Sequence, residues 1–179
     1  MRWIILLTIL AQPLSAQDCP PAADISGEMS EIMADLKVSR GTVEARRLSD
    51  RLWELWLVAP DAKAQGLLDL GMAARSQFDL SGARKVLDEL VAYCPDYVEG
   101  YNQRAFASYL AQDFEAALAD LDIVLDRMPE HLGALSGKGL TLMGLGRHDE
   151  AQAALRAALA LNPWMAEREL LSEPLEQDI

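Results

Sequence analysis

Apolar and small residues recur along this chain at a nearly constant period. Four prolines (Pro60, Pro95, Pro129 and Pro163) lie 35, 34 and 34 residues apart, and the same residue classes return at the same offsets from them. The aligned columns are Leu67, Tyr101 and Leu135; Gly71, Ala105 and Gly139; Ala83, Ala117 and Ala151; and Leu87, Leu121 and Leu155. A fixed period of this size predicts a solenoid of stacked supersecondary units.

The segments between the prolines are predicted to be helical. Proline disfavours a helix interior but fits a helix start, so the four prolines mark joints. Ala, Leu, Glu, Asp and Arg dominate the chain, and most of these favour helix over sheet. We therefore predict an all-α fold with helices over residues 25–37, 43–58, 62–76, 80–93, 97–111, 114–127, 131–145, 148–161 and 163–172.

The columns resemble the tetratricopeptide repeat, whose pattern is W-x2-L-G-x2-Y, then A-x3-F, then P. The three clear copies read Leu67-x2-Leu70-Gly71-x2-Ala74, Ala83-x3-Leu87, Pro95; Tyr101-x2-Arg104-Ala105-x2-Ser108, Ala117-x3-Leu121, Pro129; and Leu135-x2-Lys138-Gly139-x2-Leu142, Ala151-x3-Leu155, Pro163. Small residues at the centre of each pair let its two helices approach closely, and large residues fill the space around the crossing. The resemblance covers roughly residues 30–171.

The resemblance implies a right-handed superhelix with a repeat domain over residues 25–171. A degenerate first repeat is expected, because Leu48-x3-Leu52 matches only the second-helix half. After the last repeat, Asn162 and Pro163 read as the N-cap and first residue of a terminal capping helix. Solenoids need such a cap to cover an exposed apolar face. Residues 172–179 are expected to be a frayed acidic tail.

The first 16 residues have the features of a cleaved secretory signal. Arg2 precedes an apolar run, residues 3–11, which is about half the roughly 20 residues that a membrane-spanning helix needs. Ser15 and Ala16 offer a small-residue cleavage point, leaving residues 17–24 as a flexible segment. The alternative is an uncleaved N-terminal core helix. We expect a periplasmic or secreted protein without stable membrane insertion after cleavage.

Two cysteines, Cys19 and Cys94, follow the proposed cleavage point. Two thiols in an oxidising compartment commonly pair, so a disulfide is one candidate. A buried unpaired Cys94 and a free thiol in the tail are the alternatives.

Family members usually hold peptides or partner proteins on the concave face, which is built mainly from first helices. On this alignment the groove candidates, mostly apolar, are Leu68, Met72, Arg75, Asn102, Phe106, Tyr109, Ser136, Leu140 and Met143. A surface rich in Met and aromatic residues suits an apolar or amphipathic partner segment. Some of these side chains could instead pack against neighbouring helices.

Two bases depart from the family pattern, because Arg104 and Lys138 stand where the family prefers Leu. They either form a cationic strip that binds an acidic group, or they form structural ion pairs with Asp120, Asp122 or Glu169.

Trp53 and Trp56 lie three residues apart and share roughly one helix face. Core packing against the first helix and an exposed aromatic patch that docks a partner are the two interpretations.

The charge and the residue types argue against several function classes. A net charge of -12 opposes nucleic-acid binding. His131 and His148 lack ligand-like spacing, so neither a metal nor a cofactor is expected, and no catalytic motif is present. The sequence therefore favours a non-catalytic adaptor that binds a protein or peptide. The alternatives are a self-associating structural module, such as a homodimer, and a chaperone-like subunit of an envelope complex.

Overall fold

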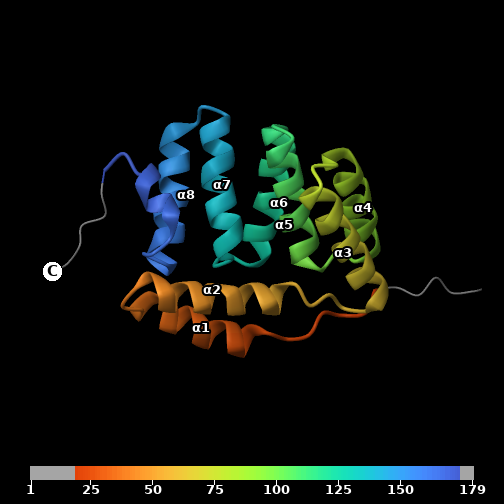
Figure 1. The fold of residues 1–179 in the computed structure, drawn as a ribbon, viewed down its shortest axis with the longest axis horizontal. Helices are drawn as coiled ribbons and strands as arrows, with labels where there is room; N and C mark the ends of the chain where they lie inside the picture. Colours follow the sequence, from red (N-terminus) through yellow and green to blue (C-terminus); the bar gives the residue numbers. More distant parts are fainter. Residues whose placement is uncertain (1–18, 174–179) are drawn as a thin grey trace, which may run out of the picture.

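The computed structural model describes residues 19–173, which form eight α-helices and one 3-10 helix (Figure 1). Their bounds are α1 Ser26–Val38, α2 Thr42–Trp56, α3 Ala62–Ser76, α4 Leu80–Tyr93, α5 Val98–Leu110, α6 Phe114–Arg127, α7 Leu132–Gly144, α8 His148–Leu161 and η1 Ala166–Leu170. The described part of the chain contains no strand. The predicted all-α solenoid is confirmed, and the bounds predicted for α3, α4, α6 and α8 match at both ends.

Helices α3 to α8 form three antiparallel pairs that stack side by side (Figure 1). The small-residue column explains the close crossing within each pair. A Cβ added at Gly71 would lie 2.7 Å from Leu87 Cγ, and one at Gly139 would lie 2.5 Å from a Leu155 methyl carbon. Ala105 occupies the same column in the middle pair and is buried. The small residues therefore recur at the repeat period because each lies where the two helices of a pair cross.

Aspartate side chains begin three of the solenoid helices. Asp61, Asp79 and Asp113 each accept a hydrogen bond from a backbone N–H three residues ahead. Such a bond satisfies one of the N–H groups that a helix start leaves without an intrahelical partner. These local signals explain why the helix starts could be predicted well.

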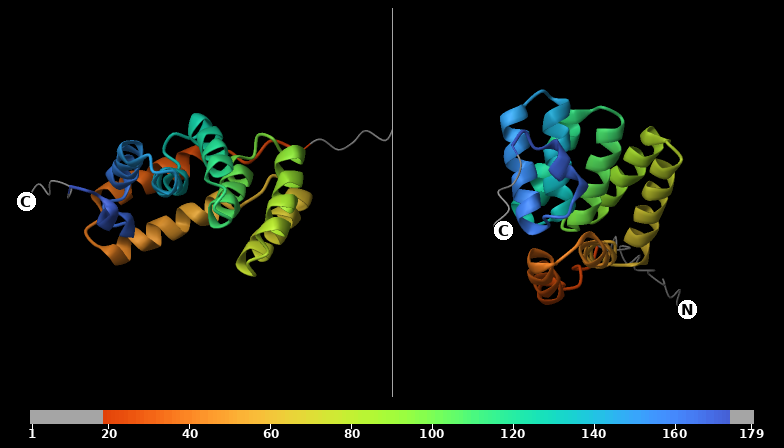
Figure 2. Two further views of the ribbon diagram at one scale, coloured as in Figure 1. Left: turned by 90° about the horizontal axis from the view of Figure 1, so that it is seen from above. Right: turned by 60° about the vertical axis from the view of Figure 1, so that its left-hand side comes forward.

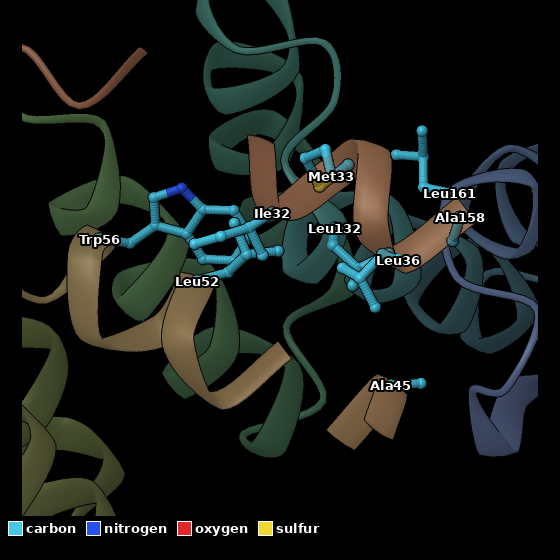
Figure 3. Packing of buried hydrophobic residues seen from close by; sticks show 9 residues of the cluster. All are labelled: Ile32, Met33, Leu36, Ala45, Leu52, Trp56, Leu132, Ala158 and Leu161. Carbon is cyan, nitrogen blue, oxygen red and sulfur yellow. The ribbon is translucent and has the colours of Figure 1, made fainter. Parts of the chain in front are cut away.

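The first two helices do not stack as a degenerate first repeat, and that prediction is wrong. The α1–α2 hairpin crosses the solenoid helices below their ends, as both Figure 1 and Figure 2 show. Its apolar side chains pack against α7 and α8 (Figure 3). The buried cluster comprises Ile32, Met33, Leu36, Ala45, Leu52, Trp56, Leu132, Ala158 and Leu161. The apolar surface buried at the far end of the solenoid accounts for this placement.

The C-terminal segment also differs from the expected capping helix. Asn162 ends α8 instead of starting a new helix, and its side-chain oxygen accepts the Trp164 N–H at 3.0 Å. The Asn162 amide donates to Ser49 Oγ at 3.1 Å, and the Trp164 indole N–H donates to the Ser39 carbonyl at 3.0 Å. Because these bonds tie the chain to the hairpin, only the short η1 follows.

Cys19 and Cys94 form a disulfide that joins the segment before α1 to the end of α4. Residues 19–25 have no regular secondary structure. No helix in the described range is long and apolar enough to cross a bilayer. The expected signal segment, residues 1–16, and most of the expected tail lie outside the described residues.

Candidate functional site

A cavity of about 520 Å³ lies on the concave side of the solenoid, and the hairpin forms one of its walls. Helices α5 and α7 form its floor, α2 one wall, and the segment after α8 one end. The floor side chains include Asn102, Gln103, Phe106, Tyr109, Ser136 and Leu140. Ser49 and Trp53 contribute from α2, and Trp164, Met165 and Glu167 contribute from the C-terminal segment. We call this space the groove cavity.

A buried hydrogen-bond network fixes the floor. The Glu99 carboxylate accepts bonds from the Asn102 and Gln103 amides. Its second oxygen lies 3.0 Å from His131 Nε2. His131 Nδ1 accepts the Ala134 N–H at 3.1 Å, so the proton of the neutral ring lies on Nε2 and is donated to Glu99. Glu99 and His131 are almost fully buried, so this pair holds the floor amides in place and is closed to a substrate.

An aromatic cluster docks α2 onto the start of α7. The Trp56 and His131 rings stack with centroids 3.9 Å apart, and Trp53 meets both rings edge-on. The Tyr97 hydroxyl donates to the Trp56 carbonyl at 2.7 Å, and burial raises the pKa of Tyr97 above its ordinary value. Trp56 is therefore a core residue, as one interpretation held, whereas Trp53 is only partly buried and lines the groove cavity.

Arg75 of α3 lies beside the floor at one end of the groove cavity. Its guanidinium donates to Gln103 Oε1 and lies 4.3 Å from the centroid of the Phe106 ring. Burial lowers the pKa of Arg75 below its ordinary value, and the nearby Glu99 charge opposes that shift. A cation–aromatic contact of this kind is stronger when it is partly removed from water.

At the other end, Ser136 donates to Glu167 Oε1 at 2.6 Å, which joins α7 to the C-terminal segment. Thr141 also lines the groove cavity, and its buried Oγ1 has no hydrogen-bond partner in the described part of the chain. Buried polar atoms are nearly always satisfied, so this fully buried hydroxyl is an exception among the lining residues. The site is thus apolar and aromatic with a few fixed polar groups.

Five of the nine groove candidates line the groove cavity, and a sixth, Arg75, contacts two of its lining residues. The five are Asn102, Phe106, Tyr109, Ser136 and Leu140. Leu68 is fully buried in the core of the first pair, so its expected place in a groove is wrong. Met72 packs against that same core and Met143 against the core of the last pair. Register alone could not show which concave positions the neighbouring helix covers.

Arg104 and Lys138 form structural ion pairs outside the groove cavity. Arg104 contacts both oxygens of the buried Asp120 at 2.6 and 2.8 Å and also reaches Asp88. The hydrogen bond with Asp120 raises the pKa of Arg104 further above its ordinary value. Lys138 Nζ lies 2.6 Å from Asp122 Oδ1. These contacts agree with the structural ion-pair interpretation, and binding of an acidic group by the two bases stays a prediction.

Several lining residues escaped the sequence analysis. Ser49 comes from the hairpin, Thr141 from α7, and Trp164 and Glu167 from the expected capping helix. Trp53 was singled out in the sequence as one of two residues of a possible aromatic docking patch. The buried network around Glu99 was also missed. Position 99 belongs to none of the aligned columns, so the repeat register gave no signal for this network.

Comparisons with known proteins agree with this architecture. Residues 132–163 match the tetratricopeptide repeat family. A TPR repeat-containing protein of Rhizobium etli is 27% identical over 118 residues, which cover 66% of this chain and 58% of the relative. The chain therefore spans little more than half the length of that relative.

Solved structures share the fold at low sequence identity. The Arabidopsis OM64 TPR domain superposes with a TM-score of 0.58, at 22% identity, over 60% of this chain and 88% of that domain. The TPR2B domain of yeast Sti1, solved as a pHsp70 complex, gives 0.55 at 24% identity over 56% and 81%. The first TPR domain of Spaghetti (RPAP3), bound to the HSP90 peptide SRMEEVD, gives 0.57 at 22% identity over 59% and 83%.

Proposed function

Because this chain is a tetratricopeptide-repeat protein, we propose that it is a non-catalytic scaffold whose groove cavity binds a short segment of a partner protein. The observation that carries the proposal is the groove cavity itself, an apolar and aromatic concave surface with a few convergent polar groups. Related domains in complexes with Hsp70 and HSP90 peptides support the class of ligand.

The partner segment proposed here is mainly apolar. The HSP90 peptide in one of those complexes, SRMEEVD, carries three acidic residues. Among the described residues that line the groove cavity here, the charged ones are Arg46 and Glu167, one of each sign. Such a lining offers no excess of positive charge to an acidic peptide. We therefore do not transfer that ligand to this chain.

We further propose that the protein works after export, in the periplasm or outside the cell, as an adaptor or accessory subunit. The signal-like segment over residues 1–16 and the Cys19–Cys94 disulfide support this proposal, because disulfides persist in oxidising compartments. Expression of the full chain, followed by N-terminal sequencing of the protein recovered outside the cytoplasm, tests it. A mature chain that begins at Gln17 is expected. An intact chain retained in the cytoplasm would contradict the proposal.

A crosslinking pull-down with matched variants tests the binding function. Phe106→Ser removes a half-exposed aromatic ring from the groove cavity, and Phe78→Ser removes a more exposed ring from the α3–α4 turn, outside the lining. We expect the wild type and Phe78→Ser to capture the same discrete partner and Phe106→Ser to lose it while keeping its helical circular-dichroism spectrum. Capture by all three variants would place the binding surface elsewhere, and recovery of the chain alone would favour self-association.

A further inference from the structure

Two groups of opposite charge lie near the two ends of the groove cavity, Arg75 beside its lining and Glu167 within it. Arg75 lies at the α3 end, where its guanidinium contacts two floor residues, Gln103 and Phe106. Glu167 lies at the other end, where the C-terminal segment meets Ser136 of α7. Arg75 does not line the cavity itself but contacts lining residues of α5, and Glu167 is a lining residue that contacts α7, so the two charged groups lie near different ends.

Arg75 retains unused hydrogen-bonding capacity. A guanidinium has five N–H donors, and the polar partner observed here is one neutral amide oxygen. No carboxylate in the described part of the chain lies within 4.0 Å of it. The buried Glu99 interacts with it over a longer range, behind the Gln103 amide. Partial burial makes an added charge-assisted bond to such a group stronger than it would be in water.

At the opposite end of the groove cavity, the Glu167 carboxylate is placed to bind a cation. Its Oε1 accepts one hydroxyl hydrogen bond, and no basic group within residues 19–173 lies within 4.0 Å of its carboxylate. Arg46 lines the same cavity from α2, but its side chain is exposed at the rim. An incoming ammonium group can therefore reach Glu167.

The space that the hairpin leaves between these ends suits an extended chain. Packed helices lie about 8–10 Å apart, so the two ends are separated by roughly 16–20 Å. An extended chain spans that distance in about five or six residues.

We propose that the groove cavity selects a short extended segment with an apolar middle, an acidic residue at the Arg75 end and a basic residue at the Glu167 end. This proposal rests on the proposed function and specifies its ligand. An extended segment is preferred to a helix because α2 of the chain itself already occupies part of the concave side.

Three capped hexapeptides test the proposal, with binding followed by NMR titration of the ¹⁵N-labelled mature chain. The probes are acetyl-Asp-Leu-Phe-Val-Leu-Lys-amide and the same peptide with Lys or with Asp at both ends. The bipolar probe is expected to bind about ten-fold more tightly than either of the others, because each of those mismatches one charge-assisted bond. General attraction to an acidic chain would instead favour the probe with two Lys residues.

Two charge-reversal variants should each bind one of the mismatched probes more tightly than the wild type does. In Glu167→Lys the probe with two Asp residues should become the tightest, and in Arg75→Glu the probe with two Lys residues should. Arg46→Gln removes a rim charge and should keep the bipolar preference. Because a gain cannot come from misfolding, these variants separate recognition from stability.

The outcomes distinguish this inference from the function on which it rests. If the three probes bind the wild type in the groove cavity with equal affinity, or if the doubly basic probe binds best, the inference is overturned and the binding function stands. If none of the probes shifts the resonances of residues in the groove cavity, both the ligand and the function proposed for this cavity are wrong.

Discussion

At the residue scale, one column of the repeat shows how burial sets the strength of an ion pair. Arg104 and Lys138 stand 34 positions apart; Arg104 pairs with Asp120, sixteen residues later, and Lys138 pairs with Asp122, sixteen residues earlier. The side chain of Asp120 is only 7% exposed, whereas that of Asp122 is 54% exposed. A carboxylate that is buried and loses its cation costs far more free energy than one that stays in water.

This contrast predicts unequal costs for the same substitution. Arg104→Leu should lower the free energy of unfolding by about 2–4 kcal/mol, because it leaves the buried Asp120 carboxylate without its cation. Lys138→Leu should change that free energy by less than about 1 kcal/mol. Urea denaturation followed by circular dichroism measures both. Equal losses in the two variants would show that the burial of Asp120 does not determine the cost.

The helix turns contain a second residue-level signal. Phe78, Gln112 and Gly146 occupy equivalent positions, with φ angles of 60°, 60° and 72°. The left-handed region costs a residue other than glycine roughly 1–2 kcal/mol. Of these three turns, only the last has a glycine at this position, Gly146. Phe78 is also 78% exposed, so its ring contributes little packing.

Phe78→Gly should therefore raise the free energy of unfolding by about 0.5 kcal/mol, after the greater entropy of glycine in the unfolded chain is subtracted. The control is Phe78→Ala, which removes the ring but keeps the strained backbone and should give no gain. Thermal melts of the two variants under identical conditions provide the comparison. A gain in Phe78→Ala equal to that of Phe78→Gly would assign the effect to the exposed ring.

At the element scale, the hairpin fits closely onto α7. A Cβ on Gly133 would lie 2.7 Å from Trp53 Cη2, and the rigid indole already contacts Trp56 and His131. Gly66 of α3 provides the opposite case, since a Cβ there would meet nothing within 4 Å.

The same substitution should therefore have opposite effects at the two glycines. Gly66→Ala should stabilise the protein by up to about 1 kcal/mol through helix propensity. Gly133→Ala should destabilise it, because the displaced Trp53 ring costs more than the propensity gains, and tryptophan fluorescence should shift in this variant alone. Chemical denaturation followed by fluorescence measures both effects. Stabilisation by Gly133→Ala would show that α2 docks less tightly than the contact implies.

How far the sequence could predict each element depended on the range of the contacts involved. The solenoid helices follow from local signals such as the Asp79 and Asp113 caps and the 34-residue columns, which repeat within each pair. The hairpin and the C-terminal segment are placed by bonds between residues 113 and 125 positions apart, Ser49 with Asn162 and Ser39 with Trp164. Such contacts occur once and leave no periodic trace. The same division explains why the floor of the groove cavity could be predicted from register while its wall and one end could not.

At the scale of the whole molecule, the disulfide and the hairpin core stabilise different parts. Cys19 packs with the first pair, around α3 and α4, while the hairpin side chains pack around α7 and α8. The bond joins residues 75 positions apart, and the loop that it closes contains α1, α2, α3 and α4. Closing a loop of that length restricts the unfolded chain, which stabilises the folded state by about 4 kcal/mol at most in the entropic account.

Reduction of the disulfide should therefore weaken the fold without opening the groove cavity. The double variant Cys19→Ser, Cys94→Ser should lose about 2–4 kcal/mol of unfolding free energy, measured in urea against the oxidised wild type. Its affinity for the bipolar hexapeptide should stay within about two-fold, because none of the residues that line the groove cavity belongs to α4 or to the segment before α1. A large loss of affinity with helix content retained would show that the tether before α1 positions α2, and that the wall of the groove cavity depends on the redox state of the compartment.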